Sequence, residues 1–123
     1  MKIMVVDDEK DVQMLFEQRF RREIKEGKLA FLFAFSGEEA RDYLKSNGSK
    51  EVNQIFSDVN MPGMNGLQLL KWIKENFPDL KVAMITAYSN DENYKQALEY
   101  GCDDYLTKPI DFGVLKDKVL PNE

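Results

Sequence analysis

The strongest constraint on the fold of this chain is a strict alternation between short apolar runs and longer stretches of helical period. The apolar runs predict five strands, at residues 2–6, 29–35, 52–57, 80–85 and 102–107. After each run, apolar residues recur at spacings of three and four, which predicts an amphipathic helix. Parallel strands require crossover connections, and these are right-handed. The sequence therefore predicts a doubly wound α/β fold, with a five-stranded parallel sheet and helices on both of its faces.

The predicted helices are placed by their apolar faces and by their capping residues. The first is expected to run unbroken to about residue 27, with an apolar face made of Val12, Leu15, Phe16, Phe20 and Ile24. The other four are expected to begin at side chains that accept a hydrogen bond from the first helical turn, namely Ser36, Asn65, Ser89 and Asp111. Each strand and helix thus has a local signal of its own.

The size and composition of the chain are those of one globular domain. It has 123 residues and no shift in composition along its length, so we expect a single domain over residues 1–123. The unfolded surface is roughly 20,000 Å² and the folded surface about 7,000 Å², which allows a core without metal or disulfide support. The N-terminus has no signal-peptide pattern, and the single cysteine, Cys102, suits a reducing compartment. We therefore expect a cytoplasmic protein that does not bind membranes.

The chain contains no histidine. This excludes a Ser-His-Asp or Cys-His nucleophile system and a zinc site made of histidine and cysteine ligands. The net charge of −5 repels a phosphate backbone, so we expect no direct binding to nucleic acid. Any chemistry must therefore depend on carboxylates, amines and hydroxyls.

Acidic side chains follow two of the predicted strands. In an open α/β sheet the ligand binds outside the carboxyl ends of the strands. At those ends the first strand is followed by Asp7 and Asp8, and the third by Asp58. Carboxylates gathered in one place repel one another unless a proton or a cation neutralises them. Oxygen ligands without histidine or cysteine select Mg²⁺, Mn²⁺ or Ca²⁺, and a few carboxylates with open positions fit Mg²⁺ best.

Two other strand ends carry groups that suit phosphate chemistry. Lys108 follows the fifth strand and can place a point charge on a phosphoryl oxygen, while Thr86 follows the fourth and can donate a hydroxyl hydrogen bond. Together with a metal and a carboxylate nucleophile they make a phosphoryl-transfer site. Each residue alone also has a structural interpretation, as a helix cap, a turn residue, a strand end or a solvated charge. Their coincidence at neighbouring strand ends favours the functional interpretation.

Four motifs spread over the chain carry a family resemblance. They are VDDE at 6–9, SDVNMPGMNG at 57–66, ITA at 85–87 and DYLTKP at 104–109. In this order they resemble the receiver domain of two-component response regulators. The resemblance implies a flavodoxin-like (βα)5 fold with strand order 2-1-3-4-5.

The resemblance also implies roles for the acidic residues. Asp58 matches the phosphoacceptor of the family. Asp7, Asp8 and Asp58 would bind Mg²⁺, or Mn²⁺ in its place, together with the backbone carbonyl of Asn60. The chain is then a signalling phosphoacceptor rather than a conventional enzyme, one that catalyses its own phosphorylation and slow dephosphorylation.

Three further residues match family positions that respond to phosphorylation. Lys108 would contact the phosphoryl group, Thr86 would turn its hydroxyl toward it, and Tyr105 would move from an exposed to a buried position when Thr86 shifts. The Lys108–Pro109 peptide matches a cis bond of the family, a form essentially confined to bonds that precede proline.

The implied partners follow from the same resemblance. A histidine kinase or a phosphotransfer protein would donate the phosphoryl group, since the chain has no histidine of its own. An output domain or effector protein would bind the face formed by the fourth helix, the fifth strand and the fifth helix. A homodimer formed on phosphorylation is a further expectation.

Three other functional classes are alternatives to a phosphoacceptor receiver domain. A phosphatase of the haloacid-dehalogenase type would need a second Asp two residues after Asp7, where this chain has Glu9. A flavin-binding flavodoxin would need a phosphate loop after the first strand, where Asp7 and Asp8 repel bare phosphate. A receiver-like binding module that takes no phosphate is disfavoured, because the acidic residues, Thr86 and Lys108 are all present.

Overall fold

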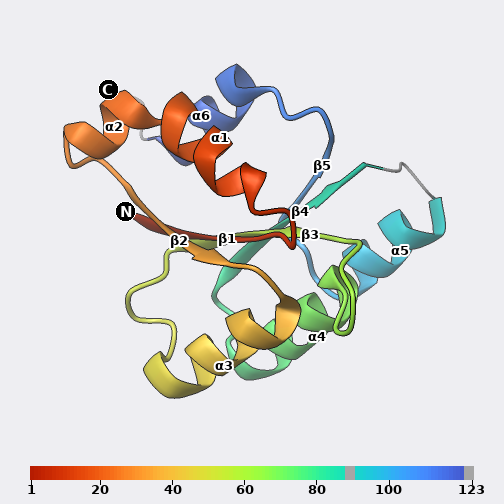
Figure 1. Ribbon diagram of the computed structural model, residues 1–123. Coiled ribbons are helices and arrows are strands. Elements are labelled where there is room, and N and C mark those ends of the chain that lie inside the picture. The colour runs from red at the N-terminus through yellow and green to blue at the C-terminus, as the bar shows by residue number, and fades with distance from the viewer. Residues whose placement is uncertain (88–90, 121–123) are drawn as a thin grey trace.

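A computed structural model of the chain describes residues 1–87 and 91–120 (Figure 1). Its centre is one parallel sheet in the order β2-β1-β3-β4-β5, so the strand order implied by the family resemblance is confirmed. The strands are β1 (Lys2–Val6), β2 (Ala30–Ala34), β3 (Gln54–Asp58), β4 (Lys81–Thr86) and β5 (Asp104–Thr107). The helices are α1 (Asp11–Arg19), α2 (Arg21–Lys25), α3 (Gly37–Asn47), α4 (Gly66–Asn76), α5 (Asp91–Glu99) and α6 (Phe112–Val119).

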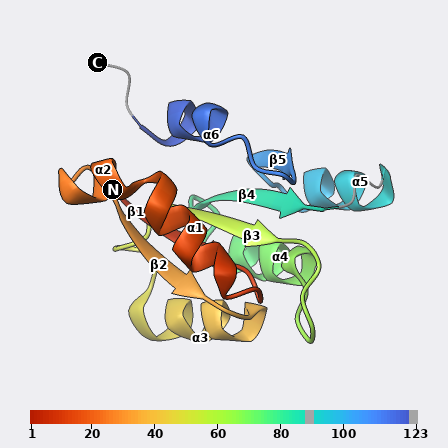
Figure 2. The same cartoon turned by 45° about the horizontal axis from the view of Figure 1, so that its top comes forward.

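Helices cover both faces of the sheet, as the doubly wound prediction requires. Helices α1, α2 and α6 lie on one face, and α3, α4 and α5 lie on the other (Figures 1 and 2). Side chains alternate between the faces along each strand. In β1, Met4 and Val6 join the core under α3 and α4, while Ile3 and Val5 join the core under α1 and α6. This burial on both faces explains why the strand reads as a continuous apolar run.

The core under α1 and α6 is rich in aromatic rings. Phe16 on α1 and Phe20 at the end of α1 are both fully buried. Each of these two rings contacts Phe31 and Phe112 edge to face, at centroid distances of 5.1 to 6.0 Å. Such edge-to-face contacts add to the free energy gained from burial. The cluster therefore fixes α1 and α6 against β2 and, through them, the segments at the carboxyl end of the sheet.

The prediction that the first helix runs unbroken to about residue 27 is wrong. The backbone leaves the helical conformation at Phe20, with φ −108° and ψ 18°, and a second short helix, α2, follows. Burial of the Phe20 ring fixes the end of α1, and the changed direction of α2 leaves Ile24 36% exposed. Leu15, also expected on the buried face, is 38% exposed. Because of this division, the second to fifth predicted helices correspond to α3, α4, α5 and α6.

The capping predictions are confirmed where the structure describes them. The Ser36 hydroxyl accepts a hydrogen bond from the Glu39 backbone N–H, and Asp111 accepts one from Val114. Asn65 and Gln68 form a reciprocal capping box at the start of α4. The predicted cap at Ser89 lies outside the described residues.

The strand predictions are accurate to one or two residues. The third strand, expected at 52–57, runs over Gln54–Asp58, and the fifth, expected at 102–107, begins at Asp104. Asp103 instead forms a turn: its backbone N–H donates to Val82 O, and its carboxylate accepts from Val82 N and from the Lys74 ammonium. These contacts bind the carboxylate of Asp103 to the neighbouring strand and to α4.

Truncation of a ring in the aromatic cluster tests this account of the core. We expect Phe16→Ala to lower the free energy of unfolding by about 3–5 kcal/mol, because it removes a fully buried ring and leaves a cavity. Urea unfolding followed by circular dichroism measures the change. Met14→Ala is the matched control on the same helix, since Met14 is 63% exposed, and its effect should stay within about 0.5 kcal/mol. Equal losses in the two variants would contradict the assignment of the core.

Candidate functional site

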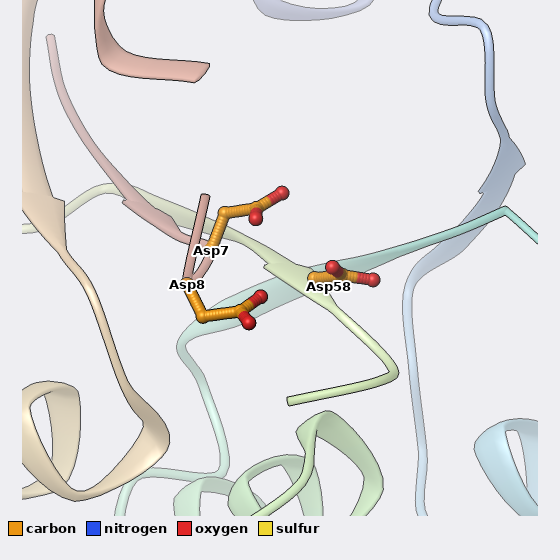
Figure 3. Close-up of side chains that lie close together, drawn as sticks. All are labelled: Asp7, Asp8 and Asp58. Atoms are coloured by element: carbon orange, nitrogen blue, oxygen red, sulfur yellow. The ribbon is translucent and has the colours of Figure 1, made fainter. Parts of the chain in front are cut away.

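Three aspartates gather at the carboxyl ends of two central strands. β1 and β3 are neighbours with Val6 opposite Ser57, so Asp7, directly after β1, lies beside Asp58, the last residue of β3. Asp7, Asp8 and Asp58 each offer a carboxylate oxygen within 4.8 Å of the others (Figure 3). Asp7 and Asp58 are only 6% and 5% exposed, whereas Asp8 is open to solvent. The predicted acidic cluster is therefore present, with one side facing outward.

Among the described residues, one ammonium group reaches into this cluster, from the end of the edge strand β5. Lys108 follows β5, and its Nζ lies 3.2 Å from Asp7 Oδ2 and 3.4 Å from Asp58 Oδ2. Its backbone N–H donates to the Thr86 carbonyl, which fixes the segment against the end of β4. The peptide from Lys108 to Pro109 is cis, as the resemblance implied. When ionised, the three carboxylates outweigh this ammonium by two negative charges.

The protonation of the pocket reflects this excess of negative charge. Burial raises the pKa of Asp58, and the neighbouring Asp7 carboxylate raises it further, against the opposing effects of Lys108 and of the Asn60 N–H. Burial lowers the pKa of Lys108, but its attraction to Asp58 and Asp7 outweighs this, so the pKa is raised above its ordinary value. Lys108 therefore stays charged, and the surroundings of Asp58 disfavour its ionised form.

The predicted hydroxyl and aromatic residues lie together at the next two strands. Thr86 is fully buried at the end of β4, one residue beyond Ile85, which pairs with Asp58 in the sheet register. The Tyr105 hydroxyl oxygen is buried and has no hydrogen-bond partner among the described residues. Burial raises its pKa, and the neighbouring Thr86 side chain opposes this shift. The Tyr105 ring also packs against Tyr94 of α5, with centroids 5.1 Å apart. A path of contacts thus leads from the end of β4 to α5.

Hydrogen bonds at both of its ends hold the loop that follows β3. The Asn60 backbone N–H donates to Asp58 Oδ1 at 3.3 Å, and the Gly66 N–H donates back to the Val59 carbonyl at 2.9 Å. A Cβ atom at Gly66 would collide with the Asp58 carbonyl oxygen, so only glycine fits where α4 begins. This close approach fixes the loop to the strand that carries Asp58.

Sequence reasoning missed one residue that contacts this loop. Glu38, in the first turn of α3, accepts a hydrogen bond from the Met64 backbone N–H. An acidic residue at a helix N-terminus is usually explained by the helix dipole alone, so the sequence held no separate signal for this contact.

A groove of about 540 Å³ adjoins the pocket on the side of α1. Its lining includes the apolar side chains of Val12, Leu15 and Phe112, and it shares Lys108 with the acidic cluster. The three aspartates lie outside this groove, so the two features are distinct.

Comparison with known proteins identifies the family. The model of the response regulator receiver domain matches residues 3–120, which is nearly the whole chain. The chain belongs to this family. It is thus a receiver domain of two-component response regulators, and the phosphatase and flavodoxin alternatives are set aside.

Several curated relatives resemble this receiver domain over most of its length. The transcriptional regulator NtrC of Proteus hauseri is 39% identical over 109 residues, covering 89% of this chain and 22% of NtrC. The response regulator PilR of Pseudomonas aeruginosa is 36% identical over 118 residues, covering 96% of this chain and 25% of PilR. This receiver domain therefore spans a quarter or less of the length of those two relatives. A CheY homologue of Campylobacter jejuni is 33% identical and is covered over 89% of its length.

Solved receiver structures share the fold. A CheY-like receiver domain from Methanospirillum hungatei superposes with a TM-score of 0.83 at 26% identity, covering 96% of this chain and 89% of that one. The response regulator TrrA from Thermotoga maritima, solved in complex with Mg²⁺ and BeF, gives a TM-score of 0.78 at 30% identity, with 96% and 95% covered. Within residues 1–87 and 91–120, no helix has the length and apolar character needed to cross a membrane.

Replacement of Asp58 by its neutral amide tests the charge balance of the pocket. In the presence of a chelator at neutral pH, we expect Asp58→Asn to raise the free energy of unfolding by about 1 kcal/mol, because it removes a buried charge beside Asp7. The folded-state pKa of Asp58 is raised, so wild-type stability increases as pH falls through that pKa, and the advantage of the variant should shrink on acidification. Denaturant unfolding at a series of pH values measures both effects.

The exposed turn residue Asp79 provides the control. Asp79→Asn should leave stability at neutral pH within about 0.5 kcal/mol of wild type. A destabilised Asp58→Asn variant, or an advantage that grows on acidification, would contradict the electrostatic account.

Proposed function

We propose that Asp58 is the phosphoacceptor of this receiver domain, in a reaction that requires Mg²⁺. The main support is its position: a buried carboxylate at the carboxyl end of a central strand, within reach of two other aspartates and 3.4 Å from an ammonium group. Burial keeps water away from the carboxylate, and the raised pKa indicates that the pocket requires added positive charge. A divalent cation meets that need.

The donor set of the pocket fits Mg²⁺. Three carboxylates supply hard oxygen ligands, and the excess of two negative charges over Lys108 matches a divalent ion. Asp7, Asp8 and Asp58 would hold it together with the backbone carbonyl of Asn60, and Mn²⁺ would substitute because it takes similar ligands. When bound, the ion neutralises charge on the phosphoryl oxygens. The Mg²⁺ complex of the structural neighbour TrrA supports this proposal.

The transfer step uses the chain's own carboxylate as the nucleophile. An oxygen of Asp58 attacks the phosphorus of a phosphohistidine on a partner kinase or phosphotransfer protein, and a new P–O bond forms as the P–N bond breaks. The electron pair of that bond returns to the imidazole nitrogen, which takes a proton from solvent. Lys108 stabilises the charge on the phosphoryl oxygens, so the rate comes mostly from positioning and electrostatics. Water later hydrolyses the acyl phosphate, and this slow dephosphorylation resets the domain.

Phosphorylation then acts on the contacts that already surround the site. Lys108 exchanges its contact with Asp7 and the bare Asp58 carboxylate for the phosphoryl oxygens, and Thr86 turns its hydroxyl toward the new anion. The Tyr105 hydroxyl is already buried near Thr86, so a shift of Thr86 would let the partly exposed ring of Tyr105 move further inward and change its contact with Tyr94 of α5. The added charge thereby shifts an equilibrium between two arrangements of the face formed by α5, β5 and α6.

This α5-β5-α6 face is the proposed site for an output domain or effector protein. It exposes the large apolar side chains of Tyr94, Leu98 and Val114, each 45% to 52% accessible. NtrC and PilR, which are much longer than this chain, support an output domain as the partner, and a homodimer formed on phosphorylation would use the same kind of surface. The free Cys102 thiol and a kinase donor both suit the cytoplasm. The net charge of −5 disfavours direct binding to nucleic acid.

Phosphorylation by a small-molecule donor tests the assignment of Asp58. Incubation with acetyl phosphate and Mg²⁺ should add one phosphoryl group, measured by intact mass, and the addition should disappear with a chelator. Asp58→Ala should abolish it completely, because among the described carboxylates only Asp7 and Asp58 pair with the Lys108 ammonium, and Asp7 is expected to hold the metal.

Asp79→Ala, at an exposed turn, is the matched control and should be phosphorylated like the wild type. An adduct that persists in Asp58→Ala would overturn the assignment. Complete absence of an adduct in the wild type would instead favour the receiver-like module that takes no phosphate.

Removal of the Thr86 hydroxyl tests the coupling to Tyr105. We expect Thr86→Ala to take up the phosphoryl group while the aromatic NMR signals of Tyr105 keep their unphosphorylated positions, because the side chain that links the two is gone. Thr86→Ser retains the hydroxyl and should restore the shift of those signals. If Tyr105 responded equally in Thr86→Ala and in the wild type, the proposed coupling would be wrong.

A further inference from the structure

The loop between β3 and α4 is held from outside by one helix. The Met64 backbone N–H donates to Oε2 of Glu38 at 3.1 Å, and Glu38 lies in the first turn of α3, 26 residues earlier in the chain. Of the described residues, Glu38 is the one side chain outside β3, the loop and α4 that accepts a hydrogen bond from the backbone of this loop. We call this contact the Glu38 clasp.

The backbone around the clasp is built for close approach. A Cβ atom at Gly37 would lie 2.7 Å from the Met64 carbonyl oxygen, so the start of α3 touches the loop directly. Gly63 has a φ of 71°, and a Cβ there would lie 2.5 Å from Glu38 Oε2. Two glycines therefore let the loop and the carboxylate meet, one by its small size and the other also by its left-handed backbone.

The carboxylate of the clasp is held in an arrangement that packing alone does not explain. The hydrogen bond from Met64 lowers the pKa of Glu38, so the group is ionised at neutral pH. Its other oxygen, Oε1, is buried and has no hydrogen-bond partner among the described residues. A buried oxygen without a partner opposes folding, so the hydrogen bond that the other oxygen accepts from Met64 is the contact that holds the carboxylate in place.

The loop that Glu38 holds also contributes to the acidic pocket. Its first half carries Asn60, whose backbone N–H donates to Asp58 Oδ1, and its ends are joined by the hydrogen bond from Gly66 to Val59. In a short loop closed in this way, a contact at Met64 restricts the backbone at Asn60 as well. When the groups that support a metal site are already ordered, the site binds the ion more tightly, because less conformational entropy is lost on binding.

We propose that Glu38 is a positioning residue for the acidic pocket: by holding the Met64 amide, it orders the β3–α4 loop and thereby strengthens binding of Mg²⁺ by Asp7, Asp8, Asp58 and Asn60. This inference rests on the proposed function of the pocket. It gives α3 a part in a site that is otherwise built from the ends of β1, β3 and β5.

Two measurements on the whole chain test the proposal. Hydrogen exchange without metal should show faster exchange of the Met64 and Asn60 amides in Glu38→Ala than in the wild type. Titration with Mg²⁺, followed by calorimetry, should give a dissociation constant raised roughly five-fold, the effect of one ordinary hydrogen bond. The melting temperature should fall by no more than a few degrees, since one hydrogen bond is lost and Glu38 lies outside both core clusters.

Two matched variants separate the hydrogen bond from the charge. Glu38→Gln keeps an oxygen that accepts from Met64 and should retain most of the affinity and protection. Asp42→Ala removes an exposed carboxylate from the same helix, where it pairs only with Arg41 among the described residues, and should bind Mg²⁺ like the wild type.

Several outcomes would overturn the proposal. These are wild-type Mg²⁺ affinity in Glu38→Ala, unchanged exchange of its loop amides, equal weakening in Asp42→Ala, or a Glu38→Gln variant as weak as Glu38→Ala. Failure of the proposed function looks different: the wild type would then bind no Mg²⁺ or take no phosphoryl group from acetyl phosphate. Absence of Mg²⁺ binding by the wild type would refute both proposals. Normal Mg²⁺ binding without phosphorylation by acetyl phosphate would refute the phosphoacceptor role alone.

Discussion

The mutual repulsion of three carboxylates is the constraint on which the rest of this site depends. Asp7 and Asp58 are brought together because β1 and β3 are hydrogen-bonded neighbours, and both are withdrawn from water that would screen their charges. One ammonium group, from Lys108, offsets part of this repulsion, and its segment is fixed to the end of β4 by a backbone hydrogen bond. The pocket is thus stable enough to form and still short of positive charge, which is the condition for binding a divalent cation.

The fold could be predicted because its signals are local and repeated. Apolar strands that are buried on both faces, capped helices and strict alternation each indicate the same parallel sheet, so an error in one signal does not change the topology. The site residues could be predicted for a related reason. Asp58 and Thr86 are the last residues of their strands, and Asp7 and Lys108 directly follow theirs. The carboxyl ends of parallel strands lie at one edge in any doubly wound sheet.

The features that could not be predicted depend on contacts between distant segments. The break at Phe20 arises because the ring is buried among Phe31 and Phe112, which lie far along the chain, and the helical period of the sequence continues through it. The contact between Glu38 and Met64 spans 26 residues and has no motif. The partial exposure of Leu15 has the same origin, because the position of α6 decides how much of α1 is covered.

The attachment of α5 sets how readily the domain can change shape. Of its nine residues only Ala97 is fully buried, whereas α4 buries five. Burial of one methyl group contributes about 0.8 kcal/mol, and the ring contact of Tyr94 with Tyr105 adds about 0.5–1.5 kcal/mol, so few contacts attach this helix. On the proposed phosphorylation of Asp58, α5 is therefore the helix that can shift at the lower cost, while α4 beside it is held by its five buried residues. Such a shift would change the surface of the domain and leave its core undisturbed.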